Sequence, residues 1–159
     1  MSSFFSSEID AGLRLGLGGA ALGNLFSVVT DAQAQALLEA AWASGCRSFD
    51  TAPHYGHGRS ERRVGDALRV RAADSYVLST KVGRLLTPNP QAPSAQHGYV
   101  DVLPFTQHWD YSASGTRRSI EDSLQRLGLP QLDVVYVHDI DVATHGAQAP
   151  AVLRQVLDE

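Results

Sequence analysis

Short apolar segments and segments with a helical period alternate along this sequence. The apolar segments cover residues 13–22, 46–50, 76–80 and 132–138, and the helical ones cover 30–45, 60–70, 115–127 and 151–159. Neighbouring parallel strands need crossover connections, which are usually helices. The order therefore predicts an α/β fold with a parallel sheet. The strands are nearly continuous apolar runs, which is typical of a sheet covered on both faces.

The predicted helix at residues 30–45 has the clearest boundaries. Thr30 and Gln33 have the T-x-x-Q spacing of a capping box, in which each side chain accepts a hydrogen bond from the other residue's backbone N–H. Gly45 supplies the residue type that most often follows the end of a helix.

Length and composition limit the class of protein. With 159 residues, 43% of them hydrophobic, the chain is expected to form one domain over residues 1–159. The net charge of −4, without a run of Lys or Arg, argues against nucleic acid or a membrane surface as a partner. No secretion signal or membrane span is recognisable, so the cytoplasm is the expected location. Cys46 is the single cysteine, which excludes an internal disulfide and predicts a buried thiol.

Residues 83–114 contain four of the seven prolines and show neither a helical nor a strand period, which predicts a long loop. Loops of this length inside a compact domain are usually functional or disordered. Aromatic residues favour an ordered lid or pocket wall here; they are Tyr99, Phe105, Trp109 and Tyr111.

Ionisable residues stand at the ends of three predicted strands: Asp50, Lys81 and His138. Tyr55 lies in the loop that follows the first of them. Taken singly, a turn residue, a surface lysine and a core histidine are common alternatives. The carboxyl ends of parallel strands, however, face one crevice, where α/β folds keep their active sites. The coincidence predicts that the four side chains converge.

Such a set is suited to proton transfer at a carbonyl group. A phenol with its ordinary pKa near 10 is a poor proton donor at neutral pH, and a close ammonium group favours the phenolate. Lys81 is the candidate for that ammonium, and the Asp50 carboxylate would keep it charged. His138 could orient a carbonyl oxygen and stabilise charge developing there. Tyr55 is then the general acid, or the base in the reverse direction.

These residues resemble a known family. The segments FDTAPHYGHGRSE, STKVGR and RRSIEDSLQRLGLPQLDVVYVHDID are similar to the aldo-keto reductase superfamily. The resemblance runs from about residue 13 to the end, and the family's catalytic Asp, Tyr, Lys and His match Asp50, Tyr55, Lys81 and His138. Within the superfamily, VDVLPF and WDYS look closest to the aldose, galactose and fucose dehydrogenases and the related pyridoxal dehydrogenases.

The resemblance implies a (β/α)8 TIM barrel and hydride transfer between a nicotinamide cofactor, NAD or NADP, and a sugar, aldehyde or alcohol. It places Gly18, Gly19 and Asp50 at the cofactor. Many reductases of the superfamily have a tryptophan two residues beyond the lysine, where this chain has Gly83. That difference predicts a pocket wall rebuilt by Trp109 or Tyr111, which would line the substrate site.

The chain has room for about four of the eight strand–helix units, because a barrel of this kind needs ~250 residues. By resemblance it is the N-terminal half of a barrel, with most of the cofactor's adenosine and pyrophosphate contacts outside it. We therefore expect little activity from the chain alone. A half-barrel also exposes strand edges, which predicts self-association.

Two other functions remain open at this stage. A metal-dependent barrel hydrolase could use His54, His57, His138, Asp139 or Asp141 as ligands, although residues 54 and 57 fit surface or substrate-contact positions better and no bound metal is predicted. A regulatory or interaction subunit could keep the fold without turnover, because a fold does not fix a function. A Rossmann site is disfavoured, since the glycines of LGLGG lie within a strand and not in a turn that opens a helix.

Overall fold

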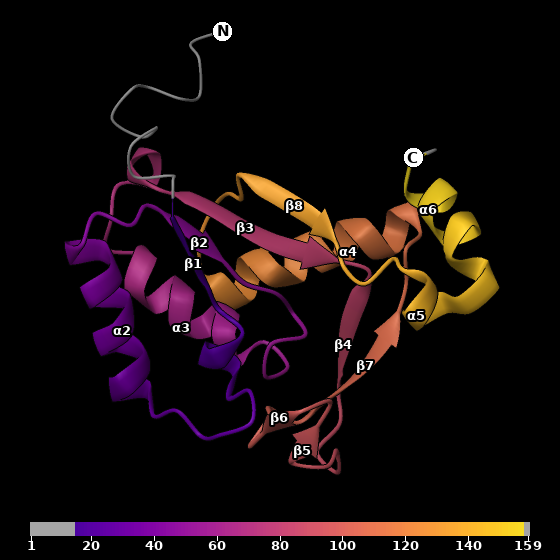
Figure 1. The fold of residues 1–159 in the computed structure, drawn as a ribbon, viewed down its shortest axis with the longest axis horizontal. Helices are drawn as coiled ribbons and strands as arrows, with labels where there is room; N and C mark the ends of the chain where they lie inside the picture. Colours follow the sequence, from indigo (N-terminus) through magenta and orange to yellow (C-terminus); the bar gives the residue numbers. More distant parts are fainter. Residues whose placement is uncertain (1–14, 158–159) are drawn as a thin grey trace, which may run out of the picture.

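A computed structural model describes residues 15–157 of the chain (Figure 1). Its centre is a four-stranded sheet in the order β1-β2-β3-β8, with every neighbouring pair parallel. The strands are β1 (Gly16–Gly18), β2 (Ser48–Asp50), β3 (Val77–Val82) and β8 (Val134–Val137). The strands follow one another in space in the same order as in the sequence, which is the strand order of one part of a β/α barrel.

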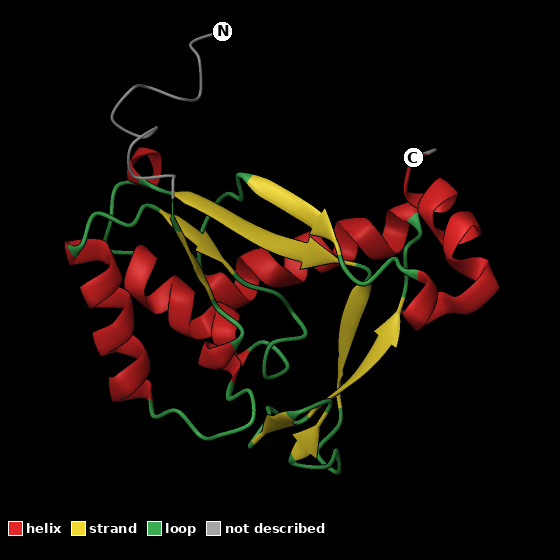
Figure 2. Ribbon diagram, in the orientation of Figure 1, coloured by secondary structure: helices red, strands yellow, loops and turns green. Residues whose placement is uncertain are grey.

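Three long helices make the crossovers between these strands: α2 (Asp31–Ala43), α3 (Arg59–Leu68) and α4 (Ala113–Leu127). They lie along one side of the sheet, with α3 between α2 and α4 (Figures 1 and 2). Short 3-10 turns lie at Ala21–Gly23 (η1) and Ala73–Ser75 (η2). After β8 the chain forms α5 (Val142–His145), a turn at Gly146–Gln148 (η3) and α6 (Ala149–Leu157).

The helix boundaries follow the sequence signals. The predicted capping box at the start of α2 is confirmed: Thr30 Oγ1 accepts from the Gln33 backbone and Gln33 Oε1 from the Thr30 backbone. Gly128 follows α4 with a φ of 64°, a left-handed conformation that glycine adopts without steric cost. β1, β2 and β8 are shorter than predicted, and β1 keeps three residues of the 13–22 segment, whose first two residues lie outside the described part of the chain. β3 instead extends two residues beyond the predicted end at residue 80.

The hydrophobic core fills the space between the sheet and the three helices. Phe49 and Leu78, partners in the parallel register, both point into it and are 1% and 0% exposed. Ala34 and Leu38 from α2, Val64 and Leu68 from α3, and Leu127 from α4 complete it. Cys46 packs against this cluster but stays half-buried, so the prediction of a buried thiol holds only in part.

The opposite face of the sheet is polar over the carboxyl ends of β2 and β3, which corrects the expectation of two covered apolar faces. Side chains alternate along a strand, so the neighbours of Phe49 and Leu78 point away from the core. On that side lie Asp50, its register partner Ser79, and Lys81. This is the face that a closed barrel turns inward.

The long loop predicted at residues 83–114 is largely two antiparallel hairpins. One pairs β4 (Arg84–Pro88) with β7 (Phe105–Trp109), and a smaller one pairs β5 (Ala95–Gln96) with β6 (Tyr99–Val100). They project from the carboxyl end of β3, away from the helices (Figure 1). The segment is therefore ordered, as its aromatic content suggested. No helix in residues 15–157 combines the length and apolarity needed to cross a membrane.

Candidate active site

Asp50 and Lys81 form an ion pair at the carboxyl ends of β2 and β3. Lys81 Nζ lies 2.6 Å from Asp50 Oδ2 and donates a second bond of 2.9 Å to the Thr51 carbonyl oxygen. The Ser79 hydroxyl donates to the other carboxylate oxygen, at 2.7 Å. The Lys81 side chain is only 13% exposed. Two fixed acceptors therefore hold a mostly buried ammonium group in one position.

Tyr55 stands in the turn that follows β2. Its backbone is held tightly, because a Cβ on Gly23 would lie 2.4 Å from the Tyr55 carbonyl carbon. Gly56 and Gly58 turn the chain through positive φ angles of 64° and 91° on either side of His57. This turn brings the Tyr55 ring over the ammonium group, with 4.8 Å between Lys81 Nζ and the ring centroid.

His138 follows β8 and faces the same place. Its backbone N–H donates to the Val82 carbonyl at 3.0 Å, which extends the β3–β8 ladder by one bond. The imidazole meets the Tyr55 ring edge-on, with 5.9 Å between centroids, and is 9% exposed. Burial, above all, lowers the pKa of His138 to about 4, although Asp139 opposes the shift. The ring is therefore neutral near pH 7.

The wall beside His138 is aromatic. Tyr111 donates its hydroxyl proton to the His138 carbonyl at 2.8 Å, and its ring stacks on Trp109 with 5.7 Å between centroids. A Cβ on Gly83 would lie 2.2 Å from the Tyr111 ring, so the absence of a side chain at residue 83 makes room for Tyr111. Of the two residues predicted to line the substrate site, Tyr111 therefore contacts His138 directly, and Trp109 stacks on Tyr111 and is the more exposed.

The two glycines expected at the cofactor differ in their surroundings. Gly19 is buried, and a Cβ there would lie 2.6 Å from the Asp50 carbonyl oxygen, so packing alone accounts for it. Gly18 is exposed and pairs in register with Asp50. A Cβ on Gly18 would meet nothing within 4 Å. Only Gly18 leaves open space on the Asp50 side of the sheet.

A polar network beside these groups was missed by the sequence analysis. Arg84, the first residue of β4, forms an ion pair with Asp139 and lies over the Trp109 ring, 3.9 Å from its centroid. Gln107 on β7 accepts hydrogen bonds from Arg84 and from His54. The contact between Arg84 and Gln107 depends on the hairpin register, in which the partner of Arg84 is Trp109.

The two histidines of the Tyr55 turn have different environments. His54 is half-buried, with its ring 5.6 Å from that of His138. His57 is fully buried and its Nδ1 lies 2.9 Å from the Phe105 carbonyl oxygen, so a surface position is wrong for it. Within residues 15–157 no three His, Cys, Asp or Glu side chains are grouped in a way that could hold a metal ion.

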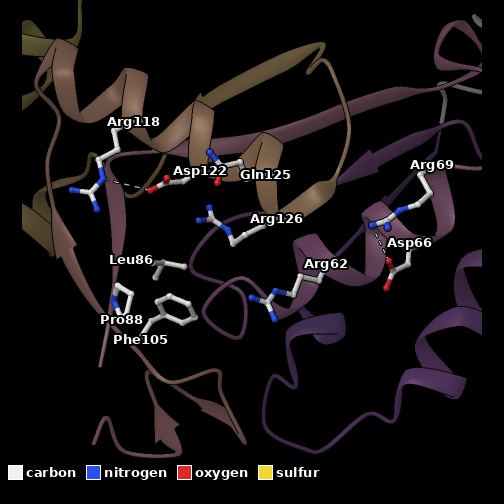
Figure 3. Close-up of a pocket in the computed structure, with 10 residues that line it drawn as sticks. All are labelled: Arg62, Asp66, Arg69, Leu86, Pro88, Phe105, Arg118, Asp122, Gln125 and Arg126. Atoms are coloured by element: carbon white, nitrogen blue, oxygen red, sulfur yellow. Dashed lines mark ion pairs between the residues drawn. The ribbon is translucent and has the colours of Figure 1, made fainter. Parts of the chain in front are cut away.

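A cavity of about 620 Å³ lies elsewhere, between α3, α4 and the β4–β7 hairpin (Figure 3). Its lining includes four arginines. Three of them already have carboxylate partners: Arg69 with Asp66, Arg118 with Asp122, and Arg126 with Glu61. None of the residues at the strand ends lines it. The cavity is therefore separate from the candidate catalytic residues at the strand ends.

Comparison with known proteins places the chain in a family. The model of the Aldo/keto reductase family matches residues 14–159. The chain belongs to this family. It is 49% identical over 140 residues to pyridoxal 4-dehydrogenase of Microbacterium luteolum, a match that covers 82% of this chain and 41% of that protein. It is 47% identical over 146 residues to D-threo-aldose 1-dehydrogenase of a Pseudomonas species, covering 87% and 44%. The chain thus spans less than half the length of these relatives.

Solved structures give the same assignment. An aldo-keto reductase from Bacillus halodurans, in its holo form, superposes with a TM-score of 0.59 and 26% identity, over 89% of this chain and 42% of that one. An aldo-keto reductase from Klebsiella pneumoniae in complex with NADPH gives 0.52 and 28%, over 77% and 34%. The four parallel strands with their helices are therefore a partial TIM barrel, as the resemblance implied.

Proposed function

We propose that the protein is an NAD(P)-dependent oxidoreductase that transfers a hydride between the nicotinamide and a carbonyl or alcohol carbon, with Tyr55 as the proton donor or acceptor. The observation that carries this proposal is the packing of Tyr55 between a fixed ammonium group and a neutral imidazole. Lys81 Nζ and the His138 ring lie 4.8 Å and 5.9 Å from the Tyr55 ring centroid. The membership of the aldo/keto reductase family supports it.

The roles of the other residues follow from their charges. The Lys81 ammonium, which lies over the Tyr55 ring, would stabilise negative charge on the phenol when its proton leaves, and the ion pair with Asp50 holds Lys81 in place. A neutral His138 carries one ring N–H, which can donate to the carbonyl oxygen of the substrate without competing as an acid. Preorganised donors of this kind act most strongly where water is excluded.

The residues present fit a nicotinamide cofactor at one point, the open surface at Gly18. A flat ring can approach the backbone of β1 there, because no side chain projects and nothing lies within 4 Å of the missing Cβ. The cofactor supplies the hydride acceptor or donor. Asp50, the register partner of Gly18, lies beside that surface, so proton transfer at Tyr55 and the redox centre would be neighbours.

The proposed substrates are hydroxylated aldehydes or alcohols, with sugars as the first class to test. Two observations support this class: the relatives named as aldose and pyridoxal dehydrogenases, and a wall that combines Trp109 and Tyr111 with the polar Arg84 and Gln107. Aromatic faces with a few fixed polar groups are a common lining for such ligands.

Replacing Tyr55 by Phe tests the proposal. We expect nicotinamide-dependent turnover to fall by about 10²–10⁴, the usual contribution of a general acid, while cofactor binding measured by fluorescence stays unchanged. Tyr76→Phe is the matched control, since Tyr76 is a core phenol outside the site. The assay covers the 159-residue chain and any longer form of the protein. Unchanged turnover in the Tyr55 variant would reject the role of Tyr55.

A further inference from the structure

Four polar side chains beside Tyr55 form a chain of hydrogen bonds whose distances favour one assignment of protons. It begins at Asp139, whose carboxylate pairs with Arg84. Desolvation works against ionisation of Asp139, but the hydrogen bond from Arg84 and the nearby charges lower its pKa overall, so it is a carboxylate near neutral pH. The Arg84 side chain is 13% exposed, and its planar group also stacks on Trp109. Arg84 is therefore held from two sides.

Arg84 fixes the orientation of the Gln107 amide. Nη1 of Arg84 lies 3.0 Å from Gln107 Oε1. A guanidinium can only donate, so the atom facing it must be the amide oxygen and not the NH₂ group. The reverse orientation would set donor against donor.

Gln107 in turn fixes the tautomer of His54. His54 Nδ1 lies 2.9 Å from the same Gln107 oxygen. Arg84 Nη1 also lies 3.4 Å from His54 Nδ1, but its contact with Gln107 Oε1 is shorter, at 3.0 Å, so its proton is assigned to that oxygen. Because Gln107 Oε1 is an acceptor, the short contact from Nδ1 to it places a proton on Nδ1. Burial, followed by the charge of Arg84, lowers the pKa of His54 to about 4, so the ring is neutral. In a neutral imidazole with Nδ1 protonated, Nε2 carries a lone pair and can only accept a hydrogen bond.

Nε2 of His54 is available to a ligand. It has no hydrogen-bond partner within residues 15–157 and, unlike Nδ1 of His138, it is not enclosed. The His54 ring lies 5.6 Å from the His138 ring and 6.3 Å from the Tyr55 ring, so it is adjacent to both. Tyr99 supports the His54 ring edge-on at 5.1 Å. The acceptor is thus held next to the groups that would face the reacting carbonyl.

We propose that His54 is a specificity-determining residue, whose Nε2 accepts a hydrogen bond from a substrate hydroxyl close to the reacting carbon. This inference rests on the proposed function and deepens it. It makes hydroxylated carbonyl compounds better substrates than equally sized ones without that hydroxyl. Gln107 and Arg84 are positioning residues, because they act through His54 and set which of its nitrogens carries the proton.

A first experiment determines which nitrogen of the His54 ring carries the proton, and it does not depend on catalytic activity. Long-range ¹H–¹⁵N correlation spectra of histidine-labelled protein distinguish the two neutral tautomers and the charged ring. We expect His54 to be Nδ1-protonated and neutral from pH 8 to about pH 5. Gln107→Leu should allow the other tautomer to gain population, and Gln35→Leu, at an exposed glutamine on α2, should leave the spectrum of His54 unchanged. An Nε2-protonated ring in the unmodified protein would overturn the inference.

A second experiment measures discrimination. The ratio of kcat/KM for an aldose to that for its deoxy analogue, lacking the hydroxyl beside the carbonyl, is compared between the unmodified protein and His54→Phe. Losing one uncharged hydrogen bond should lower this ratio by about tenfold. His108→Phe is the matched control, because His108 is the exposed neighbour of Gln107 on β7. Equal losses for both substrates would contradict the role of His54.

The two results separate the inference from the function it rests on. If no form of the protein turns over a carbonyl substrate with NAD or NADP, the proposed function fails, while the tautomer of His54 is still measured. If turnover occurs and the ratio is the same with and without His54, the function stands and the specificity role fails.

Discussion

The ring of Tyr111 occupies the space that a side chain at residue 83 would need: a Cβ on Gly83 would lie 2.2 Å from the nearest ring carbon. The same tyrosine donates a hydrogen bond to the backbone carbonyl of His138. The absence of a side chain at Gly83 therefore allows Tyr111 to connect the end of β3 to His138, the residue that follows β8.

Gly83→Ala should destabilise the fold, because a methyl group displaces Tyr111 and the backbone must keep a φ of 100°. We expect a loss of about 2–3 kcal/mol in the free energy of unfolding, measured by urea titration. Gly45→Ala is the control: its φ is 91° but a Cβ there meets nothing within 4 Å. It should cost only the backbone strain, about 1 kcal/mol. An equal loss in the free energy of unfolding for both variants would show that Tyr111 can move aside at little energetic cost.

Gly18→Val should weaken cofactor binding without weakening the fold. The side chain would project into open space on the Asp50 side of the sheet, where we place the nicotinamide. We expect the Kd for NAD or NADP, measured by fluorescence titration, to rise about tenfold or more, a loss of at least ~1.4 kcal/mol. Gly19→Ala should instead lower stability, since its Cβ would lie 2.6 Å from the Asp50 carbonyl oxygen. An unchanged Kd in the Gly18 variant would place the cofactor elsewhere.

Stability should fall as the pH drops from about 6.5 towards 4. The pKa values of His54 and His138 in the folded protein are lowered to about 4, chiefly by burial. The unfolded chain takes up protons near the ordinary value of 6.5, so acid favours unfolding across that window. Urea midpoints at pH 7, 6 and 5 measure the effect. His138→Gln should reduce the slope, and a slope that does not change would argue against a neutral buried ring.

Glu61→Gln should cost about 2 kcal/mol of stability. The Glu61 side chain is 0% exposed, and its carboxylate accepts from Arg126 Nε at 2.5 Å and from the Thr80 hydroxyl at 3.0 Å. Removing its charge leaves the guanidinium of Arg126 mostly buried without a counter-charge. Asp122→Asn, which breaks the exposed pair with Arg118, should cost no more than about 0.5 kcal/mol. Thermal or urea unfolding of both variants checks the difference.

The 159-residue chain should self-associate in solution. β1 and β8 each pair on one side only within residues 15–157, and Tyr136 on β8 is 53% exposed. Unpaired strand edges with apolar side chains favour pairing with another copy. Sedimentation velocity over a hundredfold range of concentration measures this. A single monomeric species throughout that range would contradict it.

The regular part of the fold could be predicted from sequence, because strand order and helix caps are local signals. The Thr30 capping box and the Gly128 helix end are examples. The convergence of Asp50, Tyr55, Lys81 and His138 also follows from strand ends, once the sheet is known to be parallel. Their chemical roles stay predictions until the variants are measured.

The hairpins and the network they complete could not be predicted. Residues 83–114 contain four prolines and no clear strand period, so β4 and β7 were not recognisable in the sequence. Arg84 pairs in register with Trp109, so it lies diagonally across the hairpin from Gln107, and no local pattern specifies this register. Asp139 comes close to Arg84 because it follows β8, which pairs with β3. The polar inner face was also missed, since apolar residues in a strand of three to six residues do not reveal which side is covered.

Thr80 and Lys81 are consecutive residues of β3 with opposite attachments. Thr80 is bonded to Glu61 in the helical layer, and Lys81 is bonded to Asp50 on the other face. The hydrogen bond from Thr80 to Glu61 thus fixes β3 on its helix-facing side, at the residue next to Lys81. Substitutions in the two hairpins can therefore change which substrates bind while the position of the Lys81 ammonium group stays the same. Related proteins could in this way differ in substrate preference and keep the same reaction.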